Sequence, residues 1–143
     1  MKNLVAPVVL AFFGCAHADA GGGTPSRSLY DRLGGKPAIS AVVDNLVGRV
    51  AQDDRINLRF ANTDIVHLRM MLVDQICQAS GGPCTYTGKD MKTAHHNLNI
   101  TNDEFNALVE DLLAALGELR VGAPEQQELV GALGGLKGDI VGQ

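Results

Sequence analysis

The sequence predicts a single domain with an all-α fold. Apolar residues recur at spacings of three and four over four separate segments, and no segment shows the alternation of a half-buried β-strand. Capping residues precede several of these segments, and turns containing Gly or Pro end them. The chain has 143 residues, which is about the length of one domain, and 45% of them are hydrophobic. We therefore expect a helical domain with a buried core.

Residues 1–20 have the features of a secretory signal peptide. A basic residue precedes the apolar run 4–13, and Ala18-Asp19-Ala20 matches a cleavage site between small residues. An apolar run of about ten residues is too short to cross a bilayer as a helix, so we expect no membrane span. The sequence thus predicts export to the periplasm, with 21–27 as a flexible linker and 28–143 as the folded domain.

Three cysteines are present, and each has two interpretations. Gly14-Cys15 could end a lipobox, so a lipid tether at Cys15 is an alternative to a free exported protein, although the two preceding Phe residues match that motif poorly. Cys77 and Cys84 remain after cleavage and could close a small loop over a helix end in an oxidising compartment. The alternative is a pair of free, partly buried thiols. Two cysteines are too few for a zinc site of the structural type.

The first two helices are predicted by their apolar stripes and their start signals. Pro37 occupies a first-turn position, and Asn62, Thr63 and Asp64 are N-cap candidates for the second helix. Gly81-Gly82-Pro83 ends the second helix. The first stripe consists of Ile39, Val42, Val43, Leu46, Val47 and Val50, and the second of Ile65, Leu68, Leu72, Ile76 and Ala79.

Residues 84–100 follow no regular pattern. Tyr86-Thr87-Gly88 has the composition of a turn, and Met91, His95 and Leu98 form a short one-sided series. We expect a loop that leads into at most two helical turns.

The last two helices begin with a strong signal. Thr101 and Glu104 form a capping box, and Ile100 and Phe105 occupy the positions of a hydrophobic staple. Gly122-Ala123-Pro124 ends this helix and starts the next. The stripes are Phe105, Leu108, Val109, Leu112, Leu113, Leu116 and Leu119, followed by Leu129, Val130, Leu133 and Leu136.

Composition and motifs exclude several classes of function. Twelve basic against sixteen acidic residues give a net charge of −4 without a basic cluster, which argues against a nucleic-acid partner. The chain has no G-x-S-x-G motif and no phosphate-binding loop, so the sequence offers no catalytic residue of a hydrolase.

The histidines give one candidate for a ligand. His95 and His96 are adjacent, so on a helix their side chains point about 100° apart and only one can face the interior. Spacing from Met91 and Leu98 makes His95 the inward residue and His96 the exposed one, while His67 is expected to face solvent. A packed core histidine and a metal ligand both remain open for His95.

From Ser28 to about Ile140 the chain resembles a group 1 truncated haemoglobin, the short globin whose helices form a two-over-two sandwich. The motifs that carry the resemblance are Leu29-Tyr30-Asp31-Arg32-Leu33-Gly34-Gly35, Ala38-Ile39 through Val50, Arg59-Phe60-Ala61, Gly81-Gly82-Pro83, Tyr86-Thr87-Gly88 and Met91-Lys92-Thr93-Ala94-His95. A third family site containing Gly is replaced here by Asn97-Leu98-Asn99. Asn tolerates a left-handed conformation, so the turn is expected to persist.

The resemblance implies a haem b cofactor and assigns residues to it. His95 falls on the position of the proximal iron ligand, and Phe60 on that of a Phe that stacks against the porphyrin. The apolar wall of the haem pocket falls on Leu46, Ile76, Met91 and Phe105. Arg69 and Lys89 are candidates for contacts to the propionates.

On the opposite face of the haem the chain departs from the family. Most relatives have Phe-Tyr where this chain has Leu46-Val47, and polar residues where it has Leu68, Met71 and Leu72. We therefore expect a binding protein for O2, NO or CO with no side-chain donor to the gas, and hence fast release of O2.

Three alternatives follow from the same resemblance. Met71 could act as a sixth ligand, which would give a His/Met haem protein that relays electrons from a reductase. Removal of NO by a dioxygenase-type reaction is a second alternative. A helical interaction module without haem is a third, and the presence of His95 and Phe60 argues against it.

Overall fold

The computed structural model describes residues 26–143, so the expected signal peptide and nearly all of the expected linker lie outside the described residues. Helices account for the regular structure of this part of the chain, and its only β-type contact is an isolated parallel bridge between Ile100 and Val141. The elements are α1 (Leu29–Leu33), α2 (Gly35–Val50), η1 (Asn57–Phe60), α3 (Ile65–Ala79), α4 (Met91–Ala94), α5 (Asn102–Glu118), α6 (Ala123–Gly134) and η2 (Lys137–Asp139).

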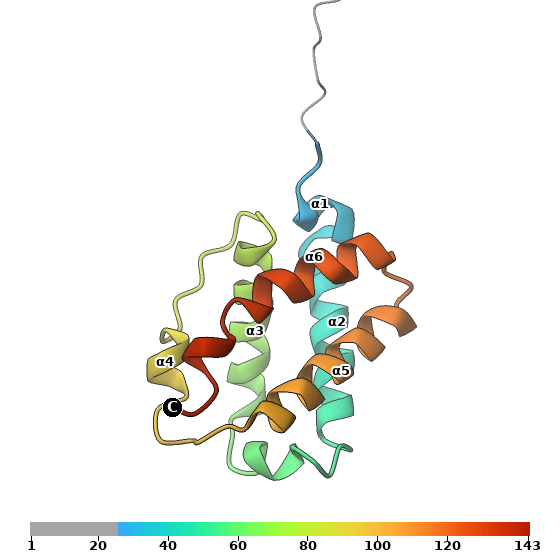
Figure 1. Ribbon diagram of the computed structural model, residues 1–143. Coiled ribbons are helices and arrows are strands. Elements are labelled where there is room, and N and C mark those ends of the chain that lie inside the picture. Colours follow the sequence, from blue (N-terminus) through green and yellow to red (C-terminus); the bar gives the residue numbers. More distant parts are fainter. Residues whose placement is uncertain (1–25) are drawn as a thin grey trace, which may run out of the picture.

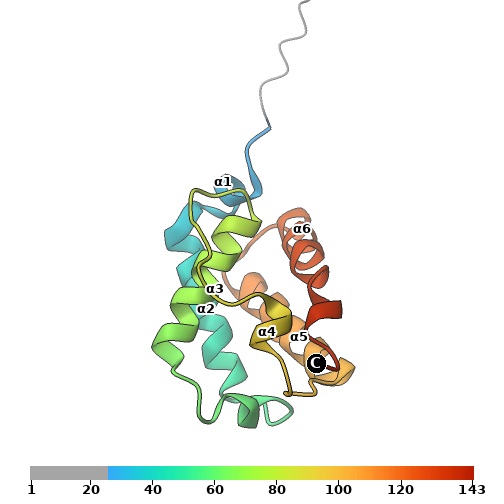
Figure 2. The same ribbon diagram turned by 90° about the vertical axis from the view of Figure 1, so that its left-hand side faces the viewer.

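Four long helices form two crossed pairs (Figure 1). Helices α2 and α3 lie side by side and pack against each other, and α5 and α6 cross them as a second layer, which is seen edge-on in Figure 2. The two layers meet mainly where α2 packs against α5 and α3 against α6. This arrangement is a two-over-two sandwich of helices, and it confirms the predicted fold class.

Local sequence explains where the long helices begin. Gly34 has φ 98°, a left-handed conformation that costs a Cβ-bearing residue energy, and it turns the chain from α1 into α2. The side chain of Asp64 accepts a hydrogen bond from His67 N at the start of α3. At the start of α5, Thr101 and Glu104 form both bonds of the predicted capping box.

The core lies between the two layers. The predicted stripe of α2 is buried there, except for Val47, which is half-buried. The stripe predicted for α3 is wrong in part: Ile76 is buried as expected, but Ala79 is exposed, and Val73 and Cys77 join the core outside the stripe. Leu113 of α5 and Leu119, the residue that caps its C-terminus, are likewise exposed. α3 and α5 each pack against more than one neighbour, so a single apolar stripe does not identify all of their buried residues.

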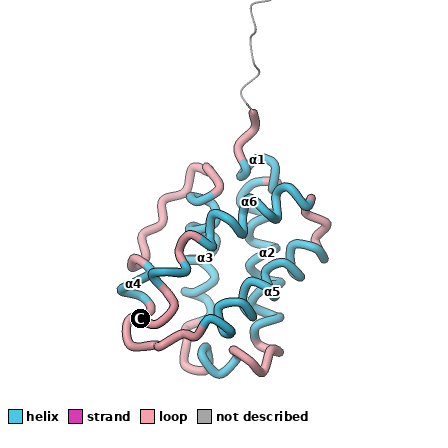
Figure 3. The backbone as a smooth tube through the Cα atoms, viewed as in Figure 1, coloured by secondary structure: helices cyan, strands magenta, loops and turns pink. Residues whose placement is uncertain are grey.

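A long irregular segment joins α3 to α5, with the one-turn helix α4 within it (Figure 3). The predicted disulfide is present between Cys77 and Cys84. Asn97 and Asn99 both have positive φ, as expected where Asn replaces the family's Gly. In the part of the chain that the structure describes, no helix has the length and apolar character required to cross a membrane.

Candidate functional site

A cavity of about 900 Å³ lies between α2 and α3 on one side and residues 86–108 on the other. Its volume is in the range of small-molecule and cofactor sites, and its walls are predominantly apolar. It is lined by Leu46, Val47, Val50, Ala51, Asn57, Leu58, Arg59, Phe60, Ala61, Thr63, Asp64, Ile65, His67, Leu68, Met71, Leu72, Gln75, Tyr86, Gly88, Lys89, Met91, Ala94, His95, Leu98, Ile100 and Leu108.

His95 is the residue with ligand chemistry on the wall formed by α4. Asp90 caps this helix by accepting a hydrogen bond from Thr93 N at 2.9 Å, and the interaction with Thr93 lowers the pKa of the Asp90 carboxyl. His95 follows the last residue of α4, and its Nδ1 lies 2.8 Å from Met91 O. A carbonyl oxygen can only accept, so Nδ1 carries the proton of the neutral ring and donates it to Met91 O. The lone pair is thereby left on Nε2, the atom that binds a metal.

The opposite wall comes from α2 and α3. Leu68, Met71 and Leu72 recur at helical spacing on the face of α3 that lines the cavity. Leu46 and Val47 line it from α2, and Phe60 from η1. Met91, His95 and Leu98 also line the cavity, as their predicted common face requires.

Other residues predicted for the site do not line the cavity. Ile76 is 2% exposed and belongs to the core, because it lies on the face of α3 that packs toward the second layer. Phe105 is half-buried beside Lys137, whose Nζ lies 5.3 Å from the ring centre. Arg69 pairs with Asp44 on the outside of α3, so of the two candidates for propionate contacts only Lys89 lines the cavity.

Gln75 is a polar lining residue that sequence reasoning missed. It lies one helical turn beyond Met71 and Leu72 on the same face of α3, and it is half-buried. Its Nε2 donates to the sulfur of Met91 at 3.3 Å, and a thioether is a weak acceptor. Helical spacing from Leu68 would have found it, but an expectation of apolar residues excluded it.

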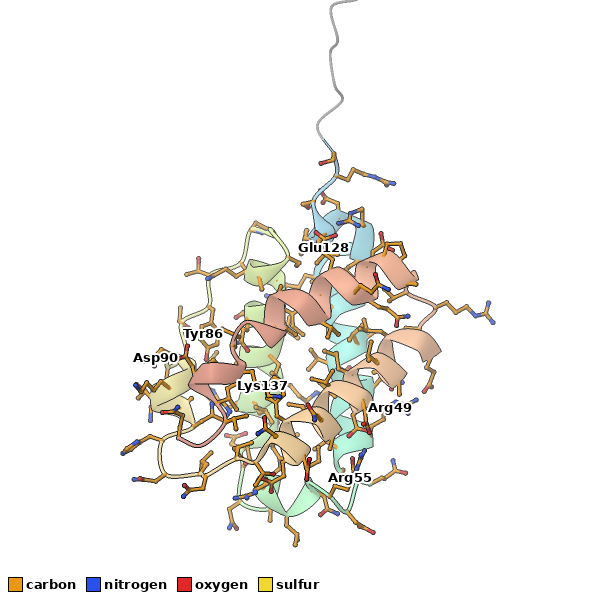
Figure 4. The ribbon with its side chains drawn as sticks, viewed as in Figure 1. Arg49, Arg55, Tyr86, Asp90, Glu128 and Lys137 are labelled. Carbon is orange, nitrogen blue, oxygen red and sulfur yellow. A yellow bond between two sulfur atoms is a disulfide. The ribbon has the colours of Figure 1, made fainter. Side chains whose placement is uncertain are left out.

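Two other half-buried polar residues of the lining have stronger partners. Asn57 Nδ2 donates to Asp54 at 3.3 Å, and the hydroxyl of Tyr86 donates to Lys89 O at 2.8 Å. Burial raises the pKa of Tyr86, so its phenol keeps its proton. Figure 4 shows Tyr86 and Asp90 close to α4, on the side of the molecule away from Arg49 and Arg55. Gln75 is therefore the half-buried donor of the lining that lacks an oxygen acceptor.

Arg59 links the rim of the cavity to two other elements. Its guanidinium donates to both carboxylate oxygens of Glu104, at 2.7 and 3.0 Å, and to Leu98 O at 3.0 Å. The Arg59 contact and the bond from Thr101 N lower the pKa of Glu104 to about 2. The charged pair thus fixes the chain just after His95 against the start of α5.

Large apolar side chains are exposed at the edge of the cavity. Leu58 is 81% exposed and Leu98 is 45% exposed, and both line the cavity. Exposed apolar surface around a hollow indicates a binding site for a group with apolar faces.

A second hollow of about 660 Å³ has the opposite character. It is lined by charged and polar residues of α2, the following loop and α5, among them Arg49, Arg55 and Asp111. Burial, with a contribution from Asp53, raises the pKa of Asp111. None of the residues predicted for the site lies in this groove, and its charges pair with one another as Arg49–Glu118 and Arg55–Asp53.

The apolar cavity fits a haem group. Its apolar walls suit the faces of a porphyrin, and His95 has the ring proton on Nδ1 that leaves Nε2 available to iron. Within residues 26–143 no group of three or more His, Cys, Asp or Glu side chains is arranged to hold a metal ion. A second imidazole of the lining, His67, is exposed at the start of α3.

Comparison with known proteins gives a consistent result. Residues 28–141 match the model of the family described as bacterial-like globin. The chain is 38% identical over 95 residues to a group 1 truncated haemoglobin of Tetrahymena pyriformis, covering 66% of this chain and 78% of that protein. It is 35% identical over 114 residues to the group 1 truncated haemoglobin GlbN of Nostoc commune, covering 80% and 97%.

Solved structures give the same similarity in three dimensions. The Fe(III) form of the Tetrahymena pyriformis truncated haemoglobin superimposes with a TM-score of 0.80 at 33% identity, covering 82% of this chain and all of that one. The 2/2 haemoglobin of a Synechococcus species, in the cyanomet state with covalently attached haem, gives 0.71 at 34% identity and covers 76% and 91%.

Proposed function

The chain belongs to the group 1 truncated haemoglobins. From this premise we propose that its apolar cavity holds haem b through His95 and admits a diatomic gas on the side of the cavity opposite His95. Truncated haemoglobins are haem-binding globins that bind gaseous ligands, and this chain has that function as a member of the family. The observation that carries the assignment of His95 is the hydrogen bond of its Nδ1 to Met91 O within the wall of the cavity.

Haem b would supply, when bound, an iron that takes an imidazole and a small gas molecule as ligands. His95 would hold this iron, and the hydrogen bond to Met91 O orients its ring. Phe60 and Met91 offer apolar surface to the porphyrin, and Lys89 a positive charge to a propionate. His96 is exposed outside the cavity lining and is assigned no role.

The gas would bind beside Val47, Leu68 and Leu72. These side chains exclude water and give no hydrogen bond, so they favour CO and NO over ligands that need a donor. Gln75 modifies the expectation of a pocket without any donor, because the acceptor of its amide hydrogen bond is only a thioether. We assign to Gln75 the polar contact to a gas ligand in this cavity.

A His/Met haem protein is the second candidate. Its support is that Met71, with a half-buried side chain, lines the same cavity as His95 from the facing helix. Met70 is exposed and does not line the cavity, so it has no such support. A protein of this type would exchange electrons with a reductase.

We also propose that the protein is exported to the periplasm. The supports are the signal-peptide pattern of residues 1–20 and the Cys77–Cys84 disulfide, since disulfides persist in oxidising compartments. The intact mass of the protein from its native host tests this. Export requires a chain that begins near Gly21, a retained signal peptide would contradict it, and a lipid on Cys15 would indicate a tethered form.

Absorption spectroscopy of the purified protein with added haemin tests the main proposal. A Soret band at one haem per chain, with a broad high-spin spectrum in the ferrous state, is expected for a gas-binding site. Sharp low-spin bands that Met71→Leu abolishes would indicate the His/Met protein instead. Without any Soret band, both assignments fail.

A further inference from the structure

The short helix that presents His95 has little support from its neighbours. α4 has four residues, and within residues 26–143 it packs extensively against no other helix. A helix of one turn is not stable by itself in water. The position of His95 therefore depends on how the chain is held before and after α4.

After α4 the chain is held by hydrogen bonds. Leu98 O accepts from Arg59 at 3.0 Å, Asn99 N donates to Gln143 O at 2.7 Å, and Gly142 N donates to Ile100 O at 2.9 Å. These bonds join the segment to η1 and to the C-terminal residues, and the C-terminus lies next to α4 in Figure 1.

Before α4 the strongest attachment is covalent. Cys77 is 0% exposed in the core face of α3, and its disulfide joins it to Cys84, with a Cα–Cα distance of 5.7 Å. Residues 84–90 are also joined to α3 by a hydrogen bond from Tyr86 N to Gln78 Oε1 at 2.7 Å, and the Gln78 side chain is exposed. The bonds of Tyr86 to Lys89 and of Asp90 to Thr93 are local and attach the segment to nothing else.

We propose that the Cys77–Cys84 disulfide positions the His95 segment and thereby determines how firmly the protein retains its haem. The proposal rests on the function proposed above. Without the disulfide, the chain from Gly82 to Leu98 keeps only hydrogen bonds to α3, from Tyr86 N to Gln78 and from Gln75 to the Met91 sulfur, and it samples more conformations. Only a fraction of these conformations places Nε2 of His95 where it can hold the iron, and haem affinity falls by that fraction.

The disulfide also makes haem retention depend on the redox state of the surroundings. A reduced thiol compound that donates two electrons to the bond would be oxidised to its own disulfide, and Cys77 and Cys84 would each gain a proton as free thiols. The haem site would remain chemically intact but would lose its upstream attachment. The protein would then retain haem well only in an oxidising compartment.

The experiment compares Cys84→Ser with its parent, both carrying Cys15→Ser so that no other thiol can pair with Cys77. The rate of haem transfer from the ferric protein to excess apomyoglobin is measured. We expect Cys84→Ser to lose haem about tenfold faster than the parent. The control is Leu133→Ala, in a half-buried residue of α6 outside the cavity, which lowers global stability without touching the segment.

A second measurement needs no haem. Amide hydrogen exchange of the apo-protein should be faster at residues 85–95 in Cys84→Ser than in the parent, and Leu133→Ala should leave these residues unchanged relative to the rest of the chain. Equal haem loss and equal exchange in Cys84→Ser and its parent would overturn the proposal while leaving haem binding intact. If Leu133→Ala loses haem as fast as Cys84→Ser, global stability is the cause and the proposal is wrong. If the parent takes up no haem, the proposed function fails, and the exchange experiment alone decides whether the disulfide fixes the segment.

Discussion

The two walls of the apolar cavity are built in different ways. One wall consists of α2 and α3, helices of 16 and 15 residues whose other faces form the core. The other consists of a one-turn helix and irregular chain, held by a disulfide at one end and hydrogen bonds at the other (Figure 2). The first wall sets the shape and polarity of the cavity. The second places one imidazole.

This difference separates two kinds of control over the site. Substitutions in the α2–α3 wall should change which gas is held and for how long, because they alter the surface that the gas contacts. Substitutions in the α4 segment should change whether haem is held at all. The core behind both walls should affect stability more than binding.

The largest effect is expected for His95→Ala, which removes the only imidazole of the α4 wall. We expect the Soret band and stoichiometric haem uptake to be lost in this variant, measured by haemin titration. His96→Ala is the matched control, since His96 is exposed and outside the cavity lining. The reverse result, with haem lost only in His96→Ala, would shift every assignment on this wall by one residue.

A smaller but still large effect is expected in the core. Leu116 of α5 is 0% exposed, and Leu116→Ala should lower the free energy of unfolding by about 2–5 kcal/mol through lost burial and the cavity left behind. Leu113→Ala, on the same helix but 38% exposed, should cost about 1 kcal/mol or less. Urea denaturation of the apo-proteins measures both. Should Leu116→Ala abolish haem uptake while the protein stays folded, core and site would not be separable as we infer.

The two walls also differ in how far the sequence predicts them. Periodicity and capping predicted α2, α3 and α5, because long helices repeat their pattern. The resemblance then assigned Leu46, Val47, Leu68 and Leu72 to the haem site, and all four line the cavity. The resemblance also placed Ile76 in the haem wall, but Ile76 lies in the core, since α3 contributes residues to both the cavity and the core. The helices α1 and η1 were not predicted from periodicity, because four or five residues are too few to show it.

The irregular wall required other information. The spacing of Met91, His95 and Leu98 predicted that His95 faces inward, but the role of His95 as a ligand came from the resemblance. The contacts that hold it, such as Arg59 to Leu98 O, join residues far apart in sequence and depend on tertiary structure. Gln75 was missed because only apolar residues were assigned to this stripe, although helical spacing from Leu68 places it on the face that lines the cavity.

Val47→Tyr should have the next largest effect, on the regular wall. Val47 is half-buried in the cavity lining, and a Tyr hydroxyl there would donate to bound O2. We expect O2 dissociation to slow by about tenfold, which corresponds to about 1.4 kcal/mol, with CO release changed far less. Stopped-flow replacement of O2 by CO measures this. Slow O2 release already in the parent would mean that a strong donor is present without the substitution.

Gln75→Leu tests the weaker donor of the same wall. Loss of its amide should speed O2 dissociation by about threefold and raise the C–O stretching frequency of the CO complex, because the field of the amide is removed. Gln127→Leu, in an exposed residue of α6 outside the cavity lining, is the control. An unchanged stretching frequency in Gln75→Leu would show that the amide does not reach the gas, and the cavity would then be apolar throughout, as the sequence alone predicts.

The smallest effect is expected on lowering the pH, which protonates Glu104 and breaks its ion pair with Arg59. The contact with Arg59 lowers the pKa of Glu104 to about 2 from an ordinary value of 4.5, so folding favours its ionised form. A depressed carboxyl pKa adds stability that is present above the pKa of the unfolded chain and is lost as pH falls from about 4.5 toward 2. Arg59 is partly exposed, so the pair should contribute about 1 kcal/mol or less at neutral pH. Glu104→Gln keeps the capping box but removes the charge. The variant should therefore be less stable than the parent at pH 7 and equally stable near pH 2, as measured by the urea midpoint across this range.

In the same pH interval the parent should lose haem faster, because Arg59 loses its charged partner. The rate of haem loss from the variant should change less, because the variant has no charge at this position to lose. A stability difference that stays constant from pH 7 to pH 2 would show that the ion pair does not fix the chain after His95.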